Sequence, residues 1–275
     1  MLIMNNRSLK IVFFGIDHFS NIVLKSLINA GHQIELVVCH EYDEEAFALL
    51  KKTCAEYNIP INKYSKVNSE EVVTAVKKAN PDLCVIGHFE RIIRKELLSI
   101  PRMGFINLHP SLLPNYRGLA PQHWPIINGE KETGITVHYV DEGTDTGDII
   151  IQRKFDLPKD LYVAELHDIW KDHYKTIMVD AINNIIDHKP TISQQGLTGS
   201  YYEKMKDQPY PLSKNWPVHK AYNWVRAMSL PYNGVSCDNL LIFKAHILAD
   251  GETVDDEPVI SFMDGSLVVD WYDEL

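Results

Sequence analysis

Short apolar runs separated by helical patterns constrain the fold of this chain more than any other feature. The runs Ile11–Phe14, Ile34–Val38 and Leu83–Ile86 are apolar or nearly so throughout. Strands that are apolar on both faces are typical of a parallel sheet covered by helices on both sides. Helical patterns follow or separate these runs at residues 22–28, 45–57 and 69–80. This order predicts an α/β fold built from βαβ units, with a mostly parallel sheet.

The pattern changes after residue 104. We expect a strand over Gly104–His109, two more over Glu132–Tyr139 and Ile149–Phe155, and a long helix over Val163–Ile186. Beyond residue 198, Tyr, Pro and Trp become frequent. The pattern there predicts a helix and three short strands, over Val218–Met228, Leu240–Phe243, Val259–Met263 and Ser266–Val269. We therefore predict an α/β domain over residues 1–198 and a small, mostly β domain over residues 199–275.

The distribution of charge argues against a nucleic-acid partner. The net charge of the 275 residues is −10, and residues 246–275 contain nine acidic residues and no Lys or Arg. A protein that binds a phosphate backbone needs a basic face, and none is visible in the sequence. The first strand-to-helix turn, Gly15-Ile16-Asp17-His18, also lacks the glycine pattern of dinucleotide binding, so we predict no NAD.

The sequence indicates a cytoplasmic protein without a membrane segment. No apolar stretch approaches the roughly 20 residues that a membrane helix needs, and Met1–Lys10 does not read as a signal peptide. The cysteines are scattered singly and lack metal-ligand spacing, so we expect free thiols and no metal. They are Cys39, Cys54, Cys84 and Cys237.

Three polar residues are candidates for catalysis. Asn107 and His109 are two apart on one predicted strand, so their side chains share a face at its carboxyl end, where ligands bind in open sheets. Asp145 lies in an acidic, glycine-punctuated loop, Asp141–Asp148. A carboxylate can orient an imidazole and raise its basicity, and an amide can donate to an oxyanion. Alone, these residues could equally be turn and hairpin residues of a ligand-binding protein.

The motifs around these residues resemble the 10-formyltetrahydrofolate-dependent formyltransferases. The resemblance rests on Asn107–Pro114, on Tyr116-Arg117-Gly118 and on Asp141–Asp148, and it covers roughly residues 9–190. It implies a Rossmann-like formyltransferase domain. A looser likeness to the small C-terminal domain of the methionyl-tRNA and nucleotide-sugar members rests on Asn215-Trp216, Val225–Ala227 and Leu230–Gly234.

The resemblance implies roles for the candidate residues. Asn107, His109 and Asp145 would form the catalytic triad. The acceptor amine would attack the formyl carbon, and His109 would take its proton. Asn107 and protonated His109 would stabilise the oxyanion, while Asp145 would keep His109 basic and correctly oriented.

The resemblance also implies the formyl donor, 10-formyltetrahydrofolate, and no metal. The pterin pocket of the family falls on a segment after the fourth predicted strand and on the loop that carries Asp145. Its residues here are Arg91, Ile92, Ile93, Asp141, Glu142, Gly143, Thr144 and Asp145.

We expect the acceptor on the other side of the triad. The helix N-terminus after the first turn would hold a diphosphate, and Tyr232 would stack on the base unless it is a core tyrosine beside a turn. His138 is predicted to be structural, as is His123 unless it lines the acceptor pocket. The candidate acceptor residues are Gly15, Asp17, Phe19, Arg117, Gln122, Trp124 and Tyr232.

The favoured acceptor is the amine of a nucleotide-linked amino-deoxy sugar, used in surface polysaccharide or lipopolysaccharide synthesis, and we expect a homodimer. One sugar-modifying branch of the family carries an arginine where this chain has Leu119, so the resemblance does not identify the sugar. The alternatives are a methionyl-tRNA formyltransferase, a formyltetrahydrofolate hydrolase and a catalytically silent folate-binding protein. Binding to tRNA, turnover without an amine, and binding without turnover would identify these in that order.

Overall fold

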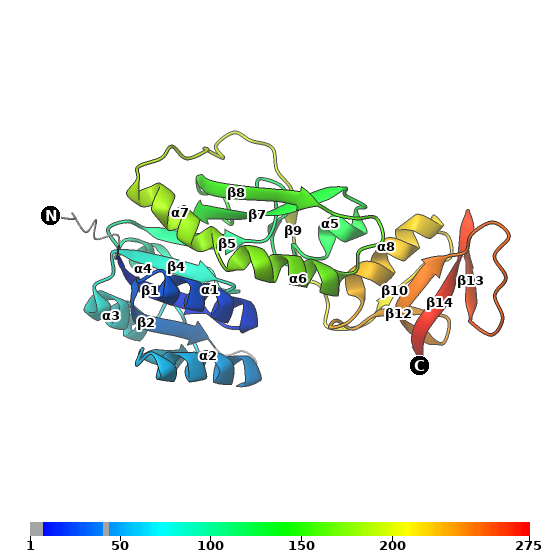
Figure 1. Ribbon diagram of the computed structural model, residues 1–275, viewed down its shortest axis with the longest axis horizontal. Coiled ribbons are helices and arrows are strands. Elements are labelled where there is room, and N and C mark those ends of the chain that lie inside the picture. The colour runs from blue at the N-terminus through cyan, green and yellow to red at the C-terminus, as the bar shows by residue number, and fades with distance from the viewer. Residues whose placement is uncertain (1–7, 41–43) are drawn as a thin grey trace. The chain divides into compact units, whose positions relative to one another are not determined.

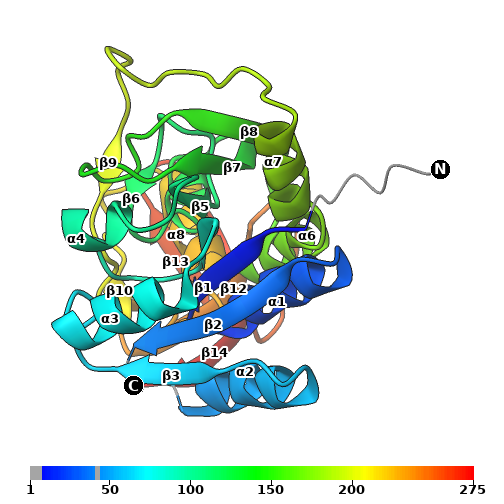
Figure 2. The ribbon, with the colours of Figure 1, turned by 90° about the vertical axis from the view of Figure 1, so that its left-hand side faces the viewer.

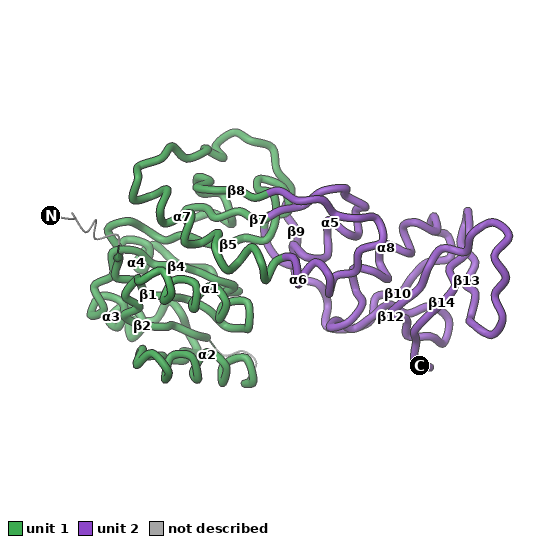
Figure 3. Tube along the Cα trace, viewed as in Figure 1, with its two compact units in different colours: residues 1–117, 135–153, 170–200 green, residues 118–134, 154–169, 201–275 purple. Residues whose placement is uncertain are grey.

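The chain divides into two compact units (Figure 3). The computed structural model describes residues 8–40 and 44–275, so most of the N-terminal stretch inspected for a signal peptide lies outside the described residues. Unit 1 takes in the chain up to residue 117, 135–153 and 170–200; unit 2 takes in 118–134, 154–169 and 201–275. The proposed domain boundary at residue 198 stays a prediction, because unit 2 also takes two segments from the middle of the chain.

A seven-stranded, mostly parallel sheet forms unit 1 and extends along two of its strands into residues of unit 2. The strand order is β3-β2-β1-β4-β5-β7-β8. The pairs β1–β2, β2–β3, β1–β4 and β4–β5 are parallel, and β5–β7 is antiparallel. This confirms the predicted α/β class. The strands are β1 Lys10–Gly15, β2 Gln33–His40, β3 Ile61–Tyr64, β4 Leu83–Gly87, β5 Phe105–His109, β7 Glu132–Tyr139 and β8 Ile149–Asp156.

Helices cover both faces of this sheet, which explains why its central strands are apolar throughout (Figures 1 and 2). Helices α1, α2 and α7 lie on one face, and α3 and α4 lie on the other (Figure 2). The helices are α1 His18–Asn29, α2 Glu44–Glu56, α3 Glu70–Ala79, α4 Lys95–Leu98, α6 Val163–Tyr174 and α7 Ile177–Ile186.

The ends of α3 follow from local chemistry. The side chain of Ser69 accepts a hydrogen bond from the amide of Val72, and Asn80 ends the helix in the left-handed conformation at φ +46°. Ser is a favoured N-cap and Asn tolerates this C-terminal geometry. The helix predicted over residues 69–80 is therefore found with these two residues as its caps.

The single helix predicted over Val163–Ile186 is wrong, because the structure has two helices, α6 and α7, separated at residues 175–176. The break leaves backbone groups without partners in the helix ladder. Arg153 of β8 donates to the carbonyl of His173 and to the hydroxyl of Thr176. This long-range contact, absent from the periodicity of the sequence, stabilises the break. The short elements β3 and α4 were not predicted.

Unit 2 contains a five-stranded sheet in the order β10-β11-β12-β14-β13, which confirms the β-rich C-terminal region. Helix α8, Val218–Met228, packs against β12 and against α5, Trp124–Ile127. A two-stranded sheet pairs β6, Arg117–Gly118, with β9, Tyr201–Tyr202. The strands of the larger sheet are β10 Tyr210–Pro211, β11 Val235–Cys237, β12 Leu240–Ile247, β13 Val259–Phe262 and β14 Gly265–Glu274.

Three properties that bear on function concern the whole described chain. The cysteines Cys39, Cys54, Cys84 and Cys237 are buried free thiols. Within residues 8–40 and 44–275, no three His, Cys, Asp or Glu side chains gather in a way that could hold a metal ion. No helix in these same ranges is long and apolar enough to pass through a membrane.

Candidate active site

The carboxyl end of β5 brings two predicted catalytic side chains to one place. Asn107 is half-buried and His109 is 4% exposed. In the antiparallel pairing with β7, Asn107 lies opposite His138 and His109 lies opposite Thr136. Because directly opposed residues on paired strands have side chains on the same face, this register adds a second imidazole to the site.

The tautomer of His109 follows from its hydrogen-bond partners. Its Nε2 lies 2.7 Å from the carbonyl oxygen of Tyr116, which can only accept, so Nε2 carries the hydrogen. Its Nδ1 faces the carboxylate of Asp145, with 3.6 Å between Nδ1 and Oδ2. In the neutral imidazole, Nδ1 is therefore the nitrogen that can accept a proton.

The surroundings of His109 hold its pKa below the ordinary value. Burial lowers the pKa most, because the charged form loses solvation. The charge of Asp145 and the carbonyl of Tyr116 raise it, and the neighbouring His138 and His88 lower it further. An imidazole whose pKa is lowered in this way is neutral at physiological pH, which is the state that a general base requires.

Asn107, His138 and Asp145 form a compact polar cluster beside His109. The Asn107 amide nitrogen lies 3.3 Å from His138 Nε2 and 3.4 Å from Asp145 Oδ1. His138 Nδ1 donates to the carbonyl of Tyr139 at 2.7 Å, so its Nε2 is the acceptor in the neutral ring. Both bonds of Asn107 are long, so its amide hydrogens can be redirected to another acceptor at little cost.

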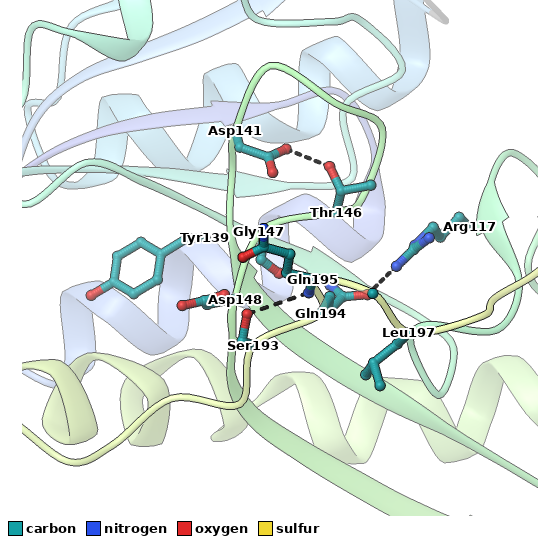
Figure 4. A pocket seen from close by; sticks show the side chains of 11 residues that line it. Arg117, Tyr139, Asp141, Thr146, Gly147, Asp148, Ser193, Gln194, Gln195 and Leu197 are labelled. Carbon is teal, nitrogen blue, oxygen red and sulfur yellow. Dashed lines mark hydrogen bonds between the residues drawn. The ribbon is translucent and has the colours of Figure 1, made fainter.

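The loop between β7 and β8 is organised by its own side chains. Asp141 Oδ1 accepts from the amide of Gly143 at 3.0 Å and from the hydroxyl of Thr146 at 2.7 Å (Figure 4). Asp145 has φ +52°, a left-handed conformation that non-glycine residues adopt infrequently. At Gly147, a Cβ atom would lie 1.9 Å from the carbonyl oxygen of Tyr139, so only glycine allows this close approach.

A cavity of about 700 Å³ lies beside this loop (Figure 4). It lies between the loop and the segment that follows α7, and Arg117 reaches it from β6. The lining residues are Arg117, Tyr139, Asp141, Thr146–Asp148 and Ser193–Leu197. The predicted acceptor residue Arg117 uses its guanidinium here for two protein contacts, to the carbonyl of Asp145 at 3.2 Å and to the side chain of Gln194 at 2.8 Å.

The structure also brings together the two segments predicted to hold the formyl donor. Asn68 fixes the segment after β4, because it donates to the carbonyl of Ile92 and accepts from the amide of Arg94, both at 2.8 Å. Lys95 lies 3.7 Å from Glu142 of the second segment. Ile92 is 70% exposed. An exposed aliphatic side chain near a loop of backbone donors and acceptors suits a flat heterocycle with polar edges.

The N-terminus of α1, where a diphosphate is predicted to bind, is capped by its own residues. Asp17 caps the helix, and its Oδ1 accepts from the amide of Ser20 at 2.8 Å. Asp17 Oδ2 lies 3.1 Å from His88 Nδ1, and the pKa of Asp17 is lowered although burial alone would raise it, because His88 and Ser20 favour the carboxylate. The carboxylate of Asp17 uses one amide at this end of the helix, and binding of a diphosphate here stays a prediction.

The remaining predicted acceptor residues divide between the units. Gly15, Asp17, Phe19 and Arg117 belong to unit 1, whereas Gln122, Trp124 and Tyr232 belong to unit 2. Within unit 2, Gln122 donates to the Tyr232 hydroxyl at 3.1 Å, and the Trp124 ring stacks on Tyr202 with centroids 4.5 Å apart. Tyr232 is half-buried, and its hydroxyl also lies 3.2 Å from His167.

Comparison with known proteins decides the family. The family model described as formyl transferase matches residues 9–182. A methionyl-tRNA formyltransferase of Ruminiclostridium cellulolyticum is 30% identical over 277 residues, which cover 95% of this chain and 88% of that protein. The chain belongs to the formyl transferase family. A methionyl-tRNA formyltransferase of Clostridioides difficile is 39% identical over 166 residues, covering 58% of this chain and 54% of that protein.

Solved structures show that this formyltransferase has the fold of its family. WlaRD, described as a sugar 3N-formyl transferase in the presence of dTDP and 5-N-formyl-THF, gives a TM-score of 0.75 at 22% identity over 97% of both chains. An N-formyltransferase from Helicobacter canadensis, in complex with folinic acid and dTDP-3-aminofucose, gives 0.73 at 19% identity over 94% of this chain and 98% of that chain.

Three site residues of the formyltransferase were not predicted in their roles. The Tyr116 carbonyl sets the tautomer of His109, His138 contacts Asn107 and Asp145, and Gln194 contacts the loop of Asp145. The alternation of β7 could have placed His138 on the same face as Thr136, but not opposite Asn107. A backbone carbonyl and a residue some 50 positions away carry no signal in the sequence.

Proposed function

We propose that this formyltransferase moves the formyl group of 10-formyltetrahydrofolate to the amine of a nucleotide-linked amino-deoxy sugar, in the cytoplasm, for surface polysaccharide synthesis. The single observation that carries the chemistry is the cluster of Asn107, His109 and Asp145 around the buried imidazole of His109. WlaRD is described as a sugar 3N-formyl transferase, and the Helicobacter canadensis N-formyltransferase was solved with dTDP-3-aminofucose. Both likenesses support the acceptor class.

The geometry of His109 gives the direction of proton transfer. The attacking amine becomes positively charged as its bond to the formyl carbon forms, and Nδ1 of His109 is the nitrogen free of a hydrogen that can take its proton. The imidazolium that results has Asp145 on one side and donates to Tyr116 on the other. Both partners favour the charged ring, so this position can act as a general base despite its burial. The bond between the formyl carbon and the folate nitrogen then breaks, and the proton passes from His109 to that nitrogen.

Asn107 supplies the donor to the oxygen that becomes negative. Its amide hydrogens make only long contacts, of 3.3 Å to His138 and 3.4 Å to Asp145. The oxyanion concentrates its charge on one oxygen, whereas the Asp145 carboxylate shares its charge between two oxygens and accepts from Asn107 only over a long distance, so a close oxyanion is the stronger acceptor. We propose that the Asn107 amide turns from these contacts to the oxyanion during the reaction.

The charge of the C-terminal region supports a small acceptor over tRNA. Residues 201–275 contain twelve acidic and six basic residues, and all nine acidic residues from 246 onward lack a basic neighbour in sequence. Binding of tRNA requires several Lys or Arg side chains that displace counterions from phosphates. A nucleotide-linked sugar carries far fewer phosphates and needs no extended basic face.

A methionyl-tRNA formyltransferase remains the second candidate, because a protein of that name is 30% identical over 95% of this chain. The two acceptors differ in their dependence on salt. If the chain acts on tRNA, it should bind tRNA at micromolar concentration in a way that weakens steeply with salt. We expect no measurable binding of tRNA at physiological salt.

The test is turnover with matched acceptors. The purified chain is given 10-formyltetrahydrofolate with a panel of dTDP- and UDP-linked amino sugars, with methionyl-tRNA, or with no acceptor, and products are identified by mass. We expect a formylated sugar, formed about 10²–10⁴-fold more slowly by the His109→Asn variant. Formylated methionyl-tRNA would replace the proposed acceptor, and formate release without an acceptor would indicate a hydrolase. Light scattering of the same sample tests the expected homodimer.

A further inference from the structure

The segment that connects α7 to β9, residues 187–200, returns to the catalytic loop. Ile192 and Ile149 of β8 exchange two backbone hydrogen bonds, of 2.8 and 2.9 Å. This short antiparallel bridge places the next residues along the loop between β7 and β8 (Figure 4). Residues 191–193 and 195–199 are exposed, whereas Gln194 is only 3% exposed.

Gln194 is buried because its side chain bonds to the loop. Its amide nitrogen donates to the carbonyl of Asp145 at 3.1 Å and to the carbonyl of Gly147 at 2.6 Å. Its oxygen accepts from the guanidinium of Arg117 at 2.8 Å (Figure 4). Both amide hydrogens and the oxygen of the carboxamide are therefore paired, and none of them contacts His109 or Asn107.

Arg117, which precedes the loop in the sequence, donates to the same backbone carbonyl as Gln194, which follows the loop. Its Nε donates to the Asp145 carbonyl at 3.2 Å, so this oxygen accepts from both Arg117 and Gln194. A charged donor forms a stronger bond than a neutral one, and the bond from Arg117 to Gln194 fixes the two side chains relative to each other. The two residues thus hold the loop at the peptide that follows Asp145.

The conformation held in this way includes a backbone angle that non-glycine residues adopt infrequently. Asp145 has φ +52°, and residues in this region persist only where surrounding contacts determine the backbone. The direction of the Asp145 side chain depends on that backbone angle. Its two oxygens lie 3.6 Å from His109 Nδ1 and 3.4 Å from the Asn107 amide nitrogen, so a rotation of the loop would separate the carboxylate from both.

We propose that Gln194, together with Arg117, is a positioning residue for the formyl transfer reaction. Gln194 contacts neither His109 nor Asn107 and acts through the backbone of Asp145, whose carboxylate it keeps directed at His109. The connecting segment, which would otherwise be only a link between elements, thereby supplies part of the catalytic geometry. This inference rests on the catalytic role of Asp145 in the proposed function.

The test combines Gln194→Ala with Asp145→Asn. We expect Gln194→Ala to lower kcat by up to about 100-fold, the cost of a displacement of about 1 Å, and to move the acid limb of the pH–rate profile to lower pH. Asp145→Asn should move that limb in the same direction. The double variant should be no slower than Asp145→Asn alone, because both changes remove the same interaction.

The control is Thr198→Ala, which truncates an exposed side chain of the same segment outside the cavity lining and should leave kcat and the pH profile unchanged. If Gln194→Ala lowers only the melting temperature, or if its loss of kcat adds fully to that of Asp145→Asn, Gln194 is structural and the proposal fails. Should Gln194→Ala not fold, Arg117→Lys tests the same backbone contact, since it removes Nε from the Asp145 carbonyl. No effect of Asp145→Asn itself would instead overturn the proposed mechanism.

Discussion

Two buried histidines, one in each unit, differ in the partner of their second ring nitrogen. His109 of unit 1 is 4% exposed and His123 of unit 2 is 2% exposed. Each has one ring nitrogen 2.7 Å from a backbone carbonyl, that of Tyr116 or that of Ala227. Burial lowers the pKa of both, and it lowers the pKa of His123 to about 4.

The second ring nitrogen makes the difference. In His109 it faces the Asp145 carboxylate at 3.6 Å, and in His123 it lies 3.2 Å from the amide nitrogen of Gln122. A carboxylate stabilises an added proton, whereas an amide hydrogen already occupies the acceptor nitrogen. At similar burial, His109 therefore faces a group that stabilises an added proton, whereas the ring of His123 is neutral at physiological pH.

Removing the imidazole of His109 tests the first half of this comparison and has the largest expected effect. His109→Asn should keep the fold and lower kcat by about 10²–10⁴-fold, as expected for loss of a positioned general base. Steady-state kinetics with the acceptor that the turnover test identifies provides the measurement. His123→Asn is the matched change in unit 2 and should not reduce kcat on that scale. Near-normal activity of His109→Asn would show that both histidines are structural.

The second prediction concerns the stability contributed by His123. Its pKa is about 4 in the folded chain and about 6.5 when unfolded, so between these values the unfolded state binds more protons. The free energy of unfolding should therefore fall as the pH drops from 6.5 to 4, by about 3 kcal/mol from this group. Denaturant titrations across this window should show a weaker pH dependence for His123→Asn. If the free energy of unfolding depends on pH equally in the two proteins, the lowered pKa of His123 is contradicted.

The third prediction concerns the charge beside His109. His109 must be unprotonated to accept a proton, so the rate falls as the pH drops through its pKa. Asp145 raises that pKa, and Asp145→Asn should therefore move the acid limb of the pH–rate profile to lower pH. We also expect a lower plateau, by about 10- to 100-fold, as for loss of other partners that orient a histidine. An unchanged profile would assign Asp145 to the structure of its loop.

The proximity of Asn107, His109 and Asp145 was predictable because these residues lie in patterns that the sequence displays. Asn107 and His109 are two apart on a strand, and Asp145 lies in a recognisable loop. The carbonyl partner of His109 was not predictable, because it depends on the backbone at Tyr116, which has φ +62°. Gln194 was missed for another reason: the bridge between Ile192 and Ile149 brings it to the loop from a distant part of the chain.

The elements of the fold also differ in whether they could be predicted from the local sequence or depend on contacts with distant residues. The central strands were predicted because each is a continuous apolar run buried on both faces. Edge strand β3 contains Asn62 and Lys63, so no such run marks it. The break between α6 and α7 depends on hydrogen bonds from Arg153, a residue on another element. Patterns within a segment were sufficient where burial was complete, and they failed where a distant contact decided the conformation.

The fourth prediction concerns the polar partners of unit 2. If Tyr232 stacks on the nucleotide base, Tyr232→Ala should raise the KM for the acceptor by roughly the 1–3 kcal/mol of a lost stack and leave the KM for the folate unchanged. Tyr232→Phe is the matched control, because it keeps the ring and removes only the hydroxyl that contacts Gln122 and His167. Equal losses toward both substrates would make Tyr232 a structural residue of unit 2, like its neighbour His123.

The smallest expected effect comes from a third histidine, His88, which lowers the pKa of His109. Gly87 of β4 pairs with Leu108 of β5, so His88 and His109 follow at the ends of neighbouring strands. His88 Nδ1 lies 3.1 Å from Asp17, and its Nε2 lies 2.9 Å from the Tyr174 hydroxyl. Of the groups that shift the pKa of His109, His88 contributes least, and it lowers that pKa.

His88→Asn should therefore move the acid limb of the pH–rate profile to higher pH, opposite to the shift of Asp145→Asn and smaller in size. Asn is the suitable replacement because His88 has φ +58°, which Asn tolerates better than most residues. Tyr174→Phe serves as the control, since it removes the hydroxyl partner and keeps the imidazole. If both variants shift the limb alike, the effect reflects packing around α6. A shift of the His88→Asn limb to lower pH would show that this imidazole does not act on His109 through its charge.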